Sequence, residues 1–460
     1  MTDLSFKSLS LSDSMLENLD SLGYLQMTRV QAETLPLVLA GQDVIGQSET
    51  GSGKTVAFAL GILSLLEPGD LAIQALVLCP TRELATQVAE ETRRLARAIN
   101  NVRVSVLCGG MPVKQQTDSL KFGTHIVIGT PGRIADHLRR NSIDLQHLKI
   151  CVFDEADRML DMGFQEEIDT ISSQLPTDRQ TLLFSATFPE GIQKIALRVL
   201  SEPAHVKVDP IKEQPNIQQA FYLTDEEHRL EALKTLLACE QPSSCLVFCQ
   251  TRQQSKDVHH TLQEQGFSSL ALHGEMEQRD RNEALVRFAN GSVTVLVATD
   301  VAARGLDIDS LELVINYQLS NDTDSHIHRI GRTGRAGKIG RALTLVTERD
   351  RLKVEYIAET TGQTVTLDQL PDIDPTASRA RPAAMVTILI QGGKKQKLRA
   401  GDILGALTGD EGIDGKQVGK INISSSHTYV AVDRQSAGKA IQKLKSDKIK
   451  GKSFRVRMLK

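Results

Sequence analysis

The stretch that decides the fold begins at Asp43 and reads Asp-Val-Ile-Gly-Gln-Ser-Glu-Thr-Gly-Ser-Gly-Lys-Thr as far as Thr55. An apolar strand, Asp43–Gly46, leads into a glycine-rich turn, and an apolar helix is expected over Val56–Leu66. Glycines let backbone N–H groups approach a phosphate, Lys54 supplies a charge, and the Thr55 hydroxyl can hold Mg²⁺. The alternative interpretation, a glycine-rich turn that binds no ligand, does not explain why a lysine and a threonine follow the glycines. The sequence therefore predicts a phosphate-binding cradle between a strand and a helix.

Outward from this cradle, short apolar runs alternate with longer segments of helical period. In the first half of the chain these runs are Ala75–Cys79, Val102–Leu107, His125–Ile128, Ile150–Phe153 and Thr181–Phe184. A second series comprises Cys245–Cys249, Ser268–Leu272, Val293–Ala298, Leu313–Tyr317 and Ala342–Val346. Nearly continuous apolar strands separated by helices are typical of a parallel sheet covered on both faces. We therefore expect two α/β domains in tandem, with ligands at the carboxyl ends of their strands.

Proline-rich breaks and one change of pattern divide the chain into three domains. The predicted boundaries are 1–208, a linker over 209–216, 217–369, a linker over 370–383, and 384–460. The last segment reads strand, helix, strand, strand, helix, strand, with bounds Met385–Ile390, Gly401–Leu407, Val418–Ile423, Thr428–Val432, Gln435–Leu444 and Phe454–Met458. This is the split βαβ order of a small α+β domain, which RNA-recognition domains share with unrelated modules.

Charge is distributed unevenly between these domains. Residues 381–460 carry 17 Lys and Arg against 6 Asp and Glu, a net charge of +11, whereas the rest carries 37 against 51, or −14. A strongly basic module on an acidic body predicts an anchor for a polyanion, most often nucleic acid. A solvated lysine face is the alternative that charge alone leaves open.

Composition excludes several classes of protein. The 460-residue chain is 40% hydrophobic and 24% charged, ordinary values for a globular protein, and no apolar run reaches the length of a membrane helix. The N-terminus has neither the basic region nor the apolar core of a secretory signal, so we expect a cytoplasmic protein. Six cysteines, none in a Cys-x-x-Cys pair, are expected to be reduced thiols rather than metal ligands.

Two adjacent carboxylates follow the strand that ends at Phe153. In Val152-Phe-Asp-Glu-Ala-Asp157, Asp154 is the candidate for Mg²⁺ coordination, partly through water, and Glu155 for positioning or deprotonating the attacking water. Acidic clusters alone usually mark a solvated loop. The cradle about 100 residues upstream makes the catalytic interpretation stronger.

These residues, with several further motifs, resemble the DEAD-box RNA helicase family. The motifs are Gly23-Tyr24 with Gln31, the cradle, Pro80-Thr-Arg-Glu-Leu84, Gly109-Gly110, Thr130-Pro-Gly-Arg133, Asp154–Asp157, Ser185-Ala-Thr187, Leu246–Thr251, Ala298-Thr-Asp300 leading to Arg304–Asp307, and His328–Arg335. The resemblance spans residues 1–365. It implies two RecA-like domains that hydrolyse ATP with Mg²⁺ and remodel RNA.

The resemblance also assigns the nucleotide site. It implies ATP binding by Phe6, Tyr24, Gln31, Ser48, Glu49, Thr50, Gly51, Ser52, Gly53, Lys54, Thr55 and Asp307. It implies catalytic roles for Lys54, Thr55, Asp154, Glu155, Arg332 and Arg335, and coupling roles for Asp157, Ser185, Thr187, His328 and Arg329. Gln31 would read adenine through its amide. Arg332 and Arg335, three apart, would share a helix face as arginine fingers that act when the domains close.

Arg29 stands where the family usually has proline, so we expect a changed turn there.

For RNA the resemblance implies a sequence-independent grip on phosphates and 2′-hydroxyls. The implied residues are Pro80, Thr81, Arg82, Glu83, Gly109, Gly110, Thr130, Pro131, Gly132, Arg133, Arg252, His273, Gly274, Thr299 and Asp300. A helicase that separates short duplexes is the first hypothesis. An ATP-gated RNA clamp or scaffold is the second, and a DNA translocase is disfavoured by Gln31 and Ser185-Ala-Thr187.

The C-terminal domain is similar to that of a bacterial DEAD-box subfamily directed at large-subunit (23S) ribosomal RNA. The resemblance implies a role in 50S subunit assembly, the pre-ribosomal large subunit as partner, no membrane, and a monomeric chain. Only Tyr429 is an aromatic candidate for stacking a base on the central strands, so base stacking on the sheet is not expected. Basic side chains instead suggest an electrostatic site for an RNA hairpin, and they are Lys394, Lys395, Lys397, Lys448, Lys450, Lys452, Arg455 and Arg457.

Overall fold

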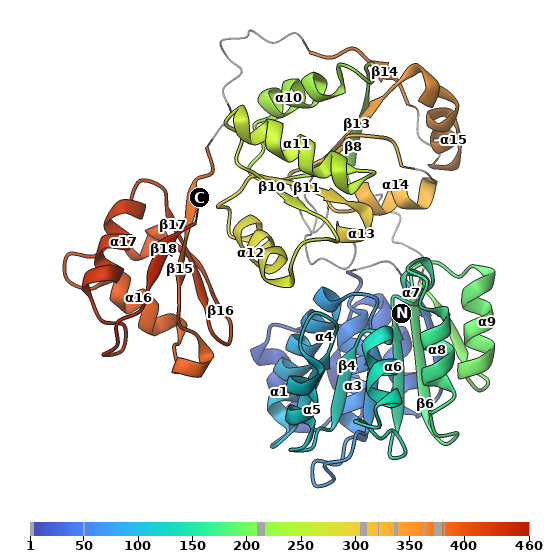
Figure 1. The fold of residues 1–460 in the computed structure, drawn as a ribbon. Helices are drawn as coiled ribbons and strands as arrows, with labels where there is room; N and C mark the ends of the chain where they lie inside the picture. The colour runs from blue at the N-terminus through green and yellow to red at the C-terminus, as the bar shows by residue number, and fades with distance from the viewer. Residues whose placement is uncertain are drawn as a thin grey trace. The chain divides into compact units, whose positions relative to one another are not determined.

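Figure 1 shows the protein as a computed structural model. The structure describes residues 4–48, 51–208, 217–303, 311–320, 322–334, 339–361, 365–371, 380 and 382–459. Several predicted site residues lie outside these ranges, namely Glu49, Thr50, Asp307 and Arg335. Linker 209–216 and most of linker 370–383 also lie outside them.

The first domain is built on a seven-stranded, all-parallel sheet in the order β3-β4-β2-β5-β6-β1-β7. Its strands are β1 (Val44–Gln47), β2 (Ala75–Leu78), β3 (Val104–Leu107), β4 (Ile126–Gly129), β5 (Ile150–Asp154), β6 (Gln180–Ser185) and β7 (Ala204–Lys207). The predicted apolar runs are confirmed as strands. β7 was not predicted, because this short edge strand buries only Val206 well.

Helices cover both faces of this sheet (Figure 1). They are α1 (Asp13–Ser21), α2 (Arg29–Leu39), α3 (Lys54–Leu65), α4 (Arg82–Leu95), α5 (Val113–Leu120), α6 (Pro131–Arg139), α7 (Ala156–Asp161), α8 (Gln165–Ser172) and α9 (Glu190–Val199). Alternating strand residues enter two separate cores: Val44 and Val77 pack with α2, α3 and α4, whereas Ile45 and Leu76 pack with α6 to α9. The sheet is therefore apolar on both faces, as the unbroken runs predict.

The second domain repeats this topology. Its all-parallel sheet has the order β10-β11-β9-β12-β13-β8-β14, so both domains follow the same path when each is numbered from its own first strand. The strands are β8 (Ile217–Leu223), β9 (Cys245–Cys249), β10 (Ser269–Leu272), β11 (Val295–Thr299), β12 (Leu313–Asn316), β13 (Gly340–Val346) and β14 (Leu367–Asp368). The helices are α10 (Arg229–Glu240), α11 (Arg252–Glu264), α12 (Gln278–Ala289), α13 (Asp300–Ala303), α14 (Thr323–Ile330) and α15 (Arg351–Thr361). The prediction of two tandem parallel-sheet domains is confirmed.

The third domain is a four-stranded antiparallel sheet in the order β16-β17-β15-β18. Its elements are β15 (Met385–Ile390), α16 (Ala400–Thr408), β16 (Val418–Ile423), β17 (Thr428–Asp433), α17 (Ala437–Ser446) and β18 (Val456–Met458). Both helices pack on one face, where Ile388, Val430, Ile403 and Leu444 meet in one core. The predicted βαββαβ order is confirmed.

Two further sequence expectations concern the chain as a whole. Among the described residues, no helix has both the length and the apolar character needed to cross a membrane. The six cysteines are free thiols, and five of them are buried as the apolar runs predict. Cys239 is the exception, because it lies on the exposed side of α10.

Candidate nucleotide and RNA sites

The phosphate cradle lies where β1 ends and α3 begins. Gly51 and Gly53 have φ values of +84° and +95°, which only glycine adopts without strain. The Lys54 ammonium is buried and donates to the Ser48 carbonyl at 2.7 Å. Burial lowers the pKa of Lys54, although nearby Asp154 and Glu155 oppose the shift. The lysine is thus held as a desolvated charge at the mouth of the turn.

Two carboxylates stand beside this lysine at the end of β5. Asp154 and Glu155 are both buried, and burial followed by the charge of Glu155 raises the pKa of Asp154. Glu155 has left-handed backbone angles, φ 55° and ψ 52°, a strained conformation that recurs at functional sites. Its carboxylate forms an ion pair with Arg158 at 3.1 Å. A divalent cation would relieve this crowding of buried negative charge, so the donor set fits Mg²⁺.

A hydrogen-bond network joins α7 to the end of β6. One Asp157 oxygen accepts from the backbone N–H of Ala186 and Thr187, at 3.1 and 2.8 Å, and from the Thr187 hydroxyl at 3.0 Å. The Ser185 hydroxyl accepts from the Asp157 backbone N–H at 3.3 Å and donates to the Thr187 carbonyl. Burial would raise the pKa of Asp157, but hydrogen bonds from Thr187 and Ser185 lower it overall. The three predicted coupling residues of this domain therefore form one hydrogen-bonded cluster, and their functional role stays a prediction.

Gln31 lies at the start of α2 against the cradle. Its amide oxygen accepts from the Thr28 backbone N–H at 2.8 Å, and its amide nitrogen donates to the Gly53 carbonyl at 3.0 Å. Both halves of the amide are thus engaged within the protein. If the Gln31 amide bound adenine, these two hydrogen bonds would be replaced by bonds to the base. Arg29 occupies the first helical position behind a complete capping box. The expectation of a changed turn there is wrong. The helix begins in the ordinary way at Arg29, a first helical position at which proline is also favoured.

The two aromatic candidates for the adenine site have different surroundings. Phe6 is buried in the α2, α3 and α4 core together with Met27. The Tyr24 hydroxyl donates to Glu91 of α4 at 2.7 Å, and burial raises the pKa of Tyr24 to about 12. Neither contact tests adenine binding, which stays a prediction for both residues.

The predicted RNA motifs of the first domain follow adjacent strands β2, β3 and β4. Thr81 caps α4 by accepting from the Leu84 backbone N–H at 3.2 Å. The Arg82 guanidinium lies against Gly109 and Gly110, where a Cβ on Gly110 would meet Arg82 Nη1 at 1.8 Å. Arg133 donates to the Met111 carbonyl at 2.9 Å. The structure therefore brings these motifs together at one edge of the sheet.

In the second domain, Arg329 is buried and fully engaged. Its Nε and Nη2 donate to the two Asp300 oxygens, both at 2.6 Å, and Nη1 donates to the Gln318 carbonyl at 2.8 Å. Its guanidinium also lies 5.2 Å from the centre of the Phe248 ring. Asp300, predicted to contact RNA, thus commits its carboxylate to this ion pair. Other predicted RNA residues lie nearby in sequence: Arg252 pairs with Glu275 at 2.8 Å, and His273 is buried.

The expectation that Arg332 lies on a helix face with Arg335 is wrong. Helix α14 ends at Ile330, and Gly331 caps it. Gly334 then has a φ of +69°, which an α-helix does not accept. Arg332 is buried within the turn, and Arg335 lies outside the described residues.

In the third domain, two basic loops lie side by side. Lys394 and Lys395 form a short 3₁₀ turn that ends at Lys397. Lys450 donates to the Lys397 carbonyl at 3.0 Å and approaches Asp402 within 3.6 Å. The structure therefore joins the loop at 394–397 to the loop at 448–452, as an electrostatic site requires.

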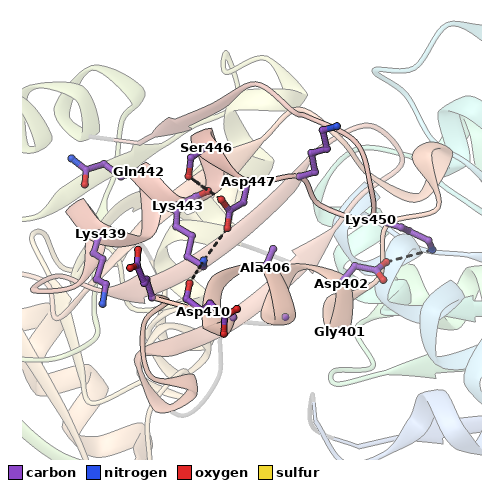
Figure 2. A pocket seen from close by; sticks show the side chains of 14 residues that line it. Gly401, Asp402, Ala406, Asp410, Lys439, Gln442, Lys443, Ser446, Asp447 and Lys450 are labelled. Carbon is purple, nitrogen blue, oxygen red and sulfur yellow. Dashed lines mark hydrogen bonds and ion pairs between the residues drawn. The ribbon is translucent and has the colours of Figure 1, made fainter.

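A groove of about 1240 Å³ runs between α16 and α17 beside Lys450 (Figure 2). Small residues, Gly401 and Gly405, open its α16 wall, and Lys439 and Lys443 line the α17 wall. Acidic residues also line it: Lys443 pairs with Asp447 at 2.8 Å. The groove is therefore mixed in charge rather than uniformly positive.

The opposite face of the third-domain sheet packs against α12 and the turn that follows it. Tyr429, Leu389 and Leu459 form an apolar cluster with Val286 of α12. The buried Thr387 hydroxyl accepts from Asn290 Nδ2 at 2.9 Å and donates to the Ser292 hydroxyl at 2.8 Å. Tyr429 is therefore covered by α12, and the expectation that bases do not stack on this sheet stays a prediction.

Arg457 departs from the predicted basic site. In the antiparallel pairing it lies opposite Leu389, whose side chain is on the α12 side of the sheet. Its guanidinium is 3.8 Å from Glu283 of α12. Arg457 thus belongs to the contact with α12 and not to the two basic loops, because strand alternation sends it to that face.

Sequence reasoning missed Gln116 of α5. It is buried and hydrogen-bonded to Arg133 at 2.6 Å. The available signal was periodicity: Val113, Gln116 and Leu120 share one helix face, so a glutamine stands where an apolar residue is expected.

Comparison with known proteins places these sites in a family context. The family profile described as DEAD/DEAH box helicase matches residues 28–195, that described as helicase conserved C-terminal domain matches 228–337, and that described as DbpA RNA binding domain matches 387–458. The chain is 50% identical over 450 residues to the ATP-dependent RNA helicase DbpA of Escherichia coli strain K12, covering 98% of each chain. It is 35% identical to DbpA of Bacillus subtilis strain 168, again covering 98% of each. Saccharomyces cerevisiae Dbp5 bound to RNA and ADP BeF3 is 29% identical with a TM-score of 0.71, covering 81% of this chain and 97% of that one.

Proposed function

The chain belongs to the DEAD/DEAH box family as an ATP-dependent RNA helicase of DbpA type, and from this premise we propose that it remodels large-subunit ribosomal RNA during 50S subunit assembly. The observation that carries the proposal is the third domain, which matches the DbpA RNA binding domain and lies in a segment with a net charge of +11. We also propose a monomeric, cytoplasmic chain, as the family resemblance implies.

The third domain is proposed as the anchor that selects the RNA. The adjoining loops at 394–397 and 448–452 offer their lysines to phosphates, with Arg455 near them in sequence. The sheet face is closed by α12, which supports recognition of a folded hairpin through loops rather than of a single strand through stacking. The two helicase domains would then act on RNA beside the anchored hairpin.

ATP hydrolysis is assigned to the buried cluster at the cradle. Lys54 would bind the terminal phosphates, and Thr55 and Asp154 would hold Mg²⁺, the latter partly through water. When bound, Mg²⁺ would neutralise charge on the phosphates as it develops. Glu155 would orient and deprotonate the attacking water, because its buried carboxyl lies close enough to Asp154 to raise the pKa of that group. We assign the arginine-finger role to Arg332 and Arg335, as the resemblance implies.

The test is steady-state ATP hydrolysis by the full chain at fixed salt. A large-subunit ribosomal RNA fragment is compared with an unrelated structured RNA of equal length, because phosphate contacts alone give salt-dependent binding. Stimulation at low concentration by the ribosomal fragment alone supports the proposal. Equal stimulation by both RNAs would make the third domain a nonspecific anchor. No stimulation by either, with RNA still bound, favours the ATP-gated clamp or scaffold.

A further inference from the structure

A buried glutamine connects two of the RNA motifs of the first domain. Gln116 is 3% exposed and is the buried residue of α5, a helix whose remaining residues are partly or fully exposed. It lies between the carboxyl end of β3, which leads to Gly109 and Gly110, and the start of α6, which carries Arg133. A buried amide on a short surface helix requires polar partners.

The hydrogen bonds of Gln116 fix the orientation of its amide. Nε2 donates to the Cys108 carbonyl at 2.9 Å, immediately before the two glycines. Oε1 accepts from Arg133 Nη1 at 2.6 Å and lies 3.0 Å from His137 Nε2. The nitrogen of the amide therefore holds one RNA motif, and the oxygen holds the other.

His137 supports the amide from behind. It is fully buried, and its Nδ1 lies 2.7 Å from the Ser142 hydroxyl. Since Gln116 Oε1 is an acceptor, the histidine must carry its proton on Nε2. Burial, followed by the charge of Arg133, lowers the pKa of His137, so the ring is neutral near pH 7. Ser142, His137 and Gln116 thus form a chain of polar contacts that ends at Arg133.

We propose that Gln116 is a positioning residue for RNA binding, which holds the Arg133 guanidinium in register with the Gly109–Gly110 turn without cancelling its charge. The inference rests on the proposed RNA site of the first domain. Arg133 commits only Nη1, which donates to Gln116 and to the Met111 carbonyl. Within the described part of the chain its Nε and Nη2 make no hydrogen bond, so they are available to a phosphate.

Because the Gln116 amide is neutral, a charged substitute can distinguish a role in positioning Arg133 from a role in stabilising the fold. A carboxylate at the same place would hold the guanidinium at least as firmly, because the pair would become charge-assisted. It would also offset the positive charge that a phosphate needs and would lose the bond to the Cys108 carbonyl. Gln116→Glu therefore separates the two roles: a structural role predicts RNA affinity that is kept, whereas positioning of a free charge predicts RNA affinity that falls.

The experiment measures the half-saturating concentration of a single-stranded RNA in ATP hydrolysis by the full chain, at several salt concentrations. The variants are Gln116→Leu, Gln116→Glu, Arg133→Ala and the double variant Gln116→Leu with Arg133→Ala. Gln115→Leu and Gln115→Glu are matched controls, because Gln115 is the exposed neighbour on the same helix. Thermal unfolding and ATP binding are recorded for each variant.

We expect both Gln116 variants to weaken RNA binding about tenfold, the effect of one charge-assisted hydrogen bond, with the rate at saturating RNA little changed. The slope of log affinity against log salt should fall by about 0.7, as for one lost phosphate contact on a single strand. The double variant should be no weaker than Arg133→Ala, because Gln116 acts through Arg133. The Gln115 controls should match the parent protein.

Two results would overturn the proposal in distinguishable ways. If Arg133→Ala weakens RNA binding but Gln116→Glu does not, the RNA site stands and the positioning role is wrong. If Arg133→Ala itself leaves RNA affinity and salt slope unchanged, the proposed site on the first domain is wrong as well.

Discussion

Thr187 donates both its backbone N–H and its hydroxyl to a single oxygen of Asp157, at 2.8 and 3.0 Å. This pair joins the helix that follows β5 to the segment that follows β6. Because the acceptor is charged, each bond is stronger than one between neutral groups. We predict that a movement at one end is transmitted to the other through this pair.

Removing the Thr187 hydroxyl should loosen this connection. Thr187→Val keeps the side-chain shape, and we expect the free energy of unfolding of the first domain to fall by about 1.5 to 3 kcal/mol. Thr170→Val is the control, since the Thr170 hydroxyl bonds only within its own helix. Urea unfolding compares the stability of the two variants. The amount of RNA duplex unwound per ATP hydrolysed should fall only for Thr187→Val. If that amount is unchanged in Thr187→Val, the coupling role is wrong.

Glu155→Gln tests the assignment of the water-activating residue. We expect the hydrolysis rate to fall by about 10² to 10⁴, the usual contribution of a general base, while ATP and RNA stay bound together. The change removes a like charge next to buried Asp154 but also the ion pair with Arg158, so thermal unfolding is recorded to show that the variant stays folded. Glu166→Gln, at an exposed position of α8, is the control. Undiminished hydrolysis by Glu155→Gln would contradict the assignment.

His326 gives the second domain a specific pH dependence. Its Nε2 lies 3.0 Å from Gln219 of β8, and burial lowers the pKa of His326 to about 4. The unfolded chain binds the proton more tightly, so stability is kept above pH 6.5 and falls as the pH drops toward 4. The loss reaches about 3 kcal/mol.

Hydrogen exchange of the β8 amides measures this effect. His326→Gln should flatten the dependence between pH 6.5 and 4, whatever its effect on absolute stability. His260→Gln should keep the dependence, because the His260 side chain is 72% exposed. An unchanged slope in His326→Gln would assign the pH dependence to another group.

Val286 tests the contact between α12 and the third domain. Val286→Asp would place a carboxylate against Leu389, Tyr429 and Leu459, and desolvating that charge should separate the surfaces. We expect faster hydrogen exchange in β18 and in the turn at Asn290, with the α16 and α17 core still protected. Leu352→Asp, at an exposed position of α15, is the control. Full protection in Val286→Asp would show that this contact does not hold the domain.

The sequence predicted those features that depend on local patterns. The strands around the cradle and the split βαβ order follow from apolar runs and turn residues, and the cradle follows from glycine spacing. The helix assumed for Arg332 was wrong because Gly331 and Gly334 end it, a local signal that the three-residue spacing obscured.

Other features depend on contacts between distant segments. Gln115 and Gln116 are adjacent residues of the same type, and the hydrogen bonds that Gln116 makes to Cys108 and Arg133 depend on how α5 packs on distant segments. The burial of Tyr429 depends on Val286, which is more than 100 positions away in the chain. Periodicity can indicate that Gln116 faces inward, but neither the partners of Gln116 nor the partner of Tyr429 is encoded in a motif.

Strand separation by the full chain with ATP tests whether the third domain directs unwinding to large-subunit ribosomal RNA. A short duplex is placed beside a large-subunit ribosomal RNA hairpin, and the same duplex is placed beside an unrelated hairpin of equal length. We expect faster separation beside the ribosomal hairpin, and this advantage should disappear when Lys394 and Lys450 are both changed to Glu. Equal rates on the two substrates, or ATP hydrolysis without strand separation on either, would contradict it.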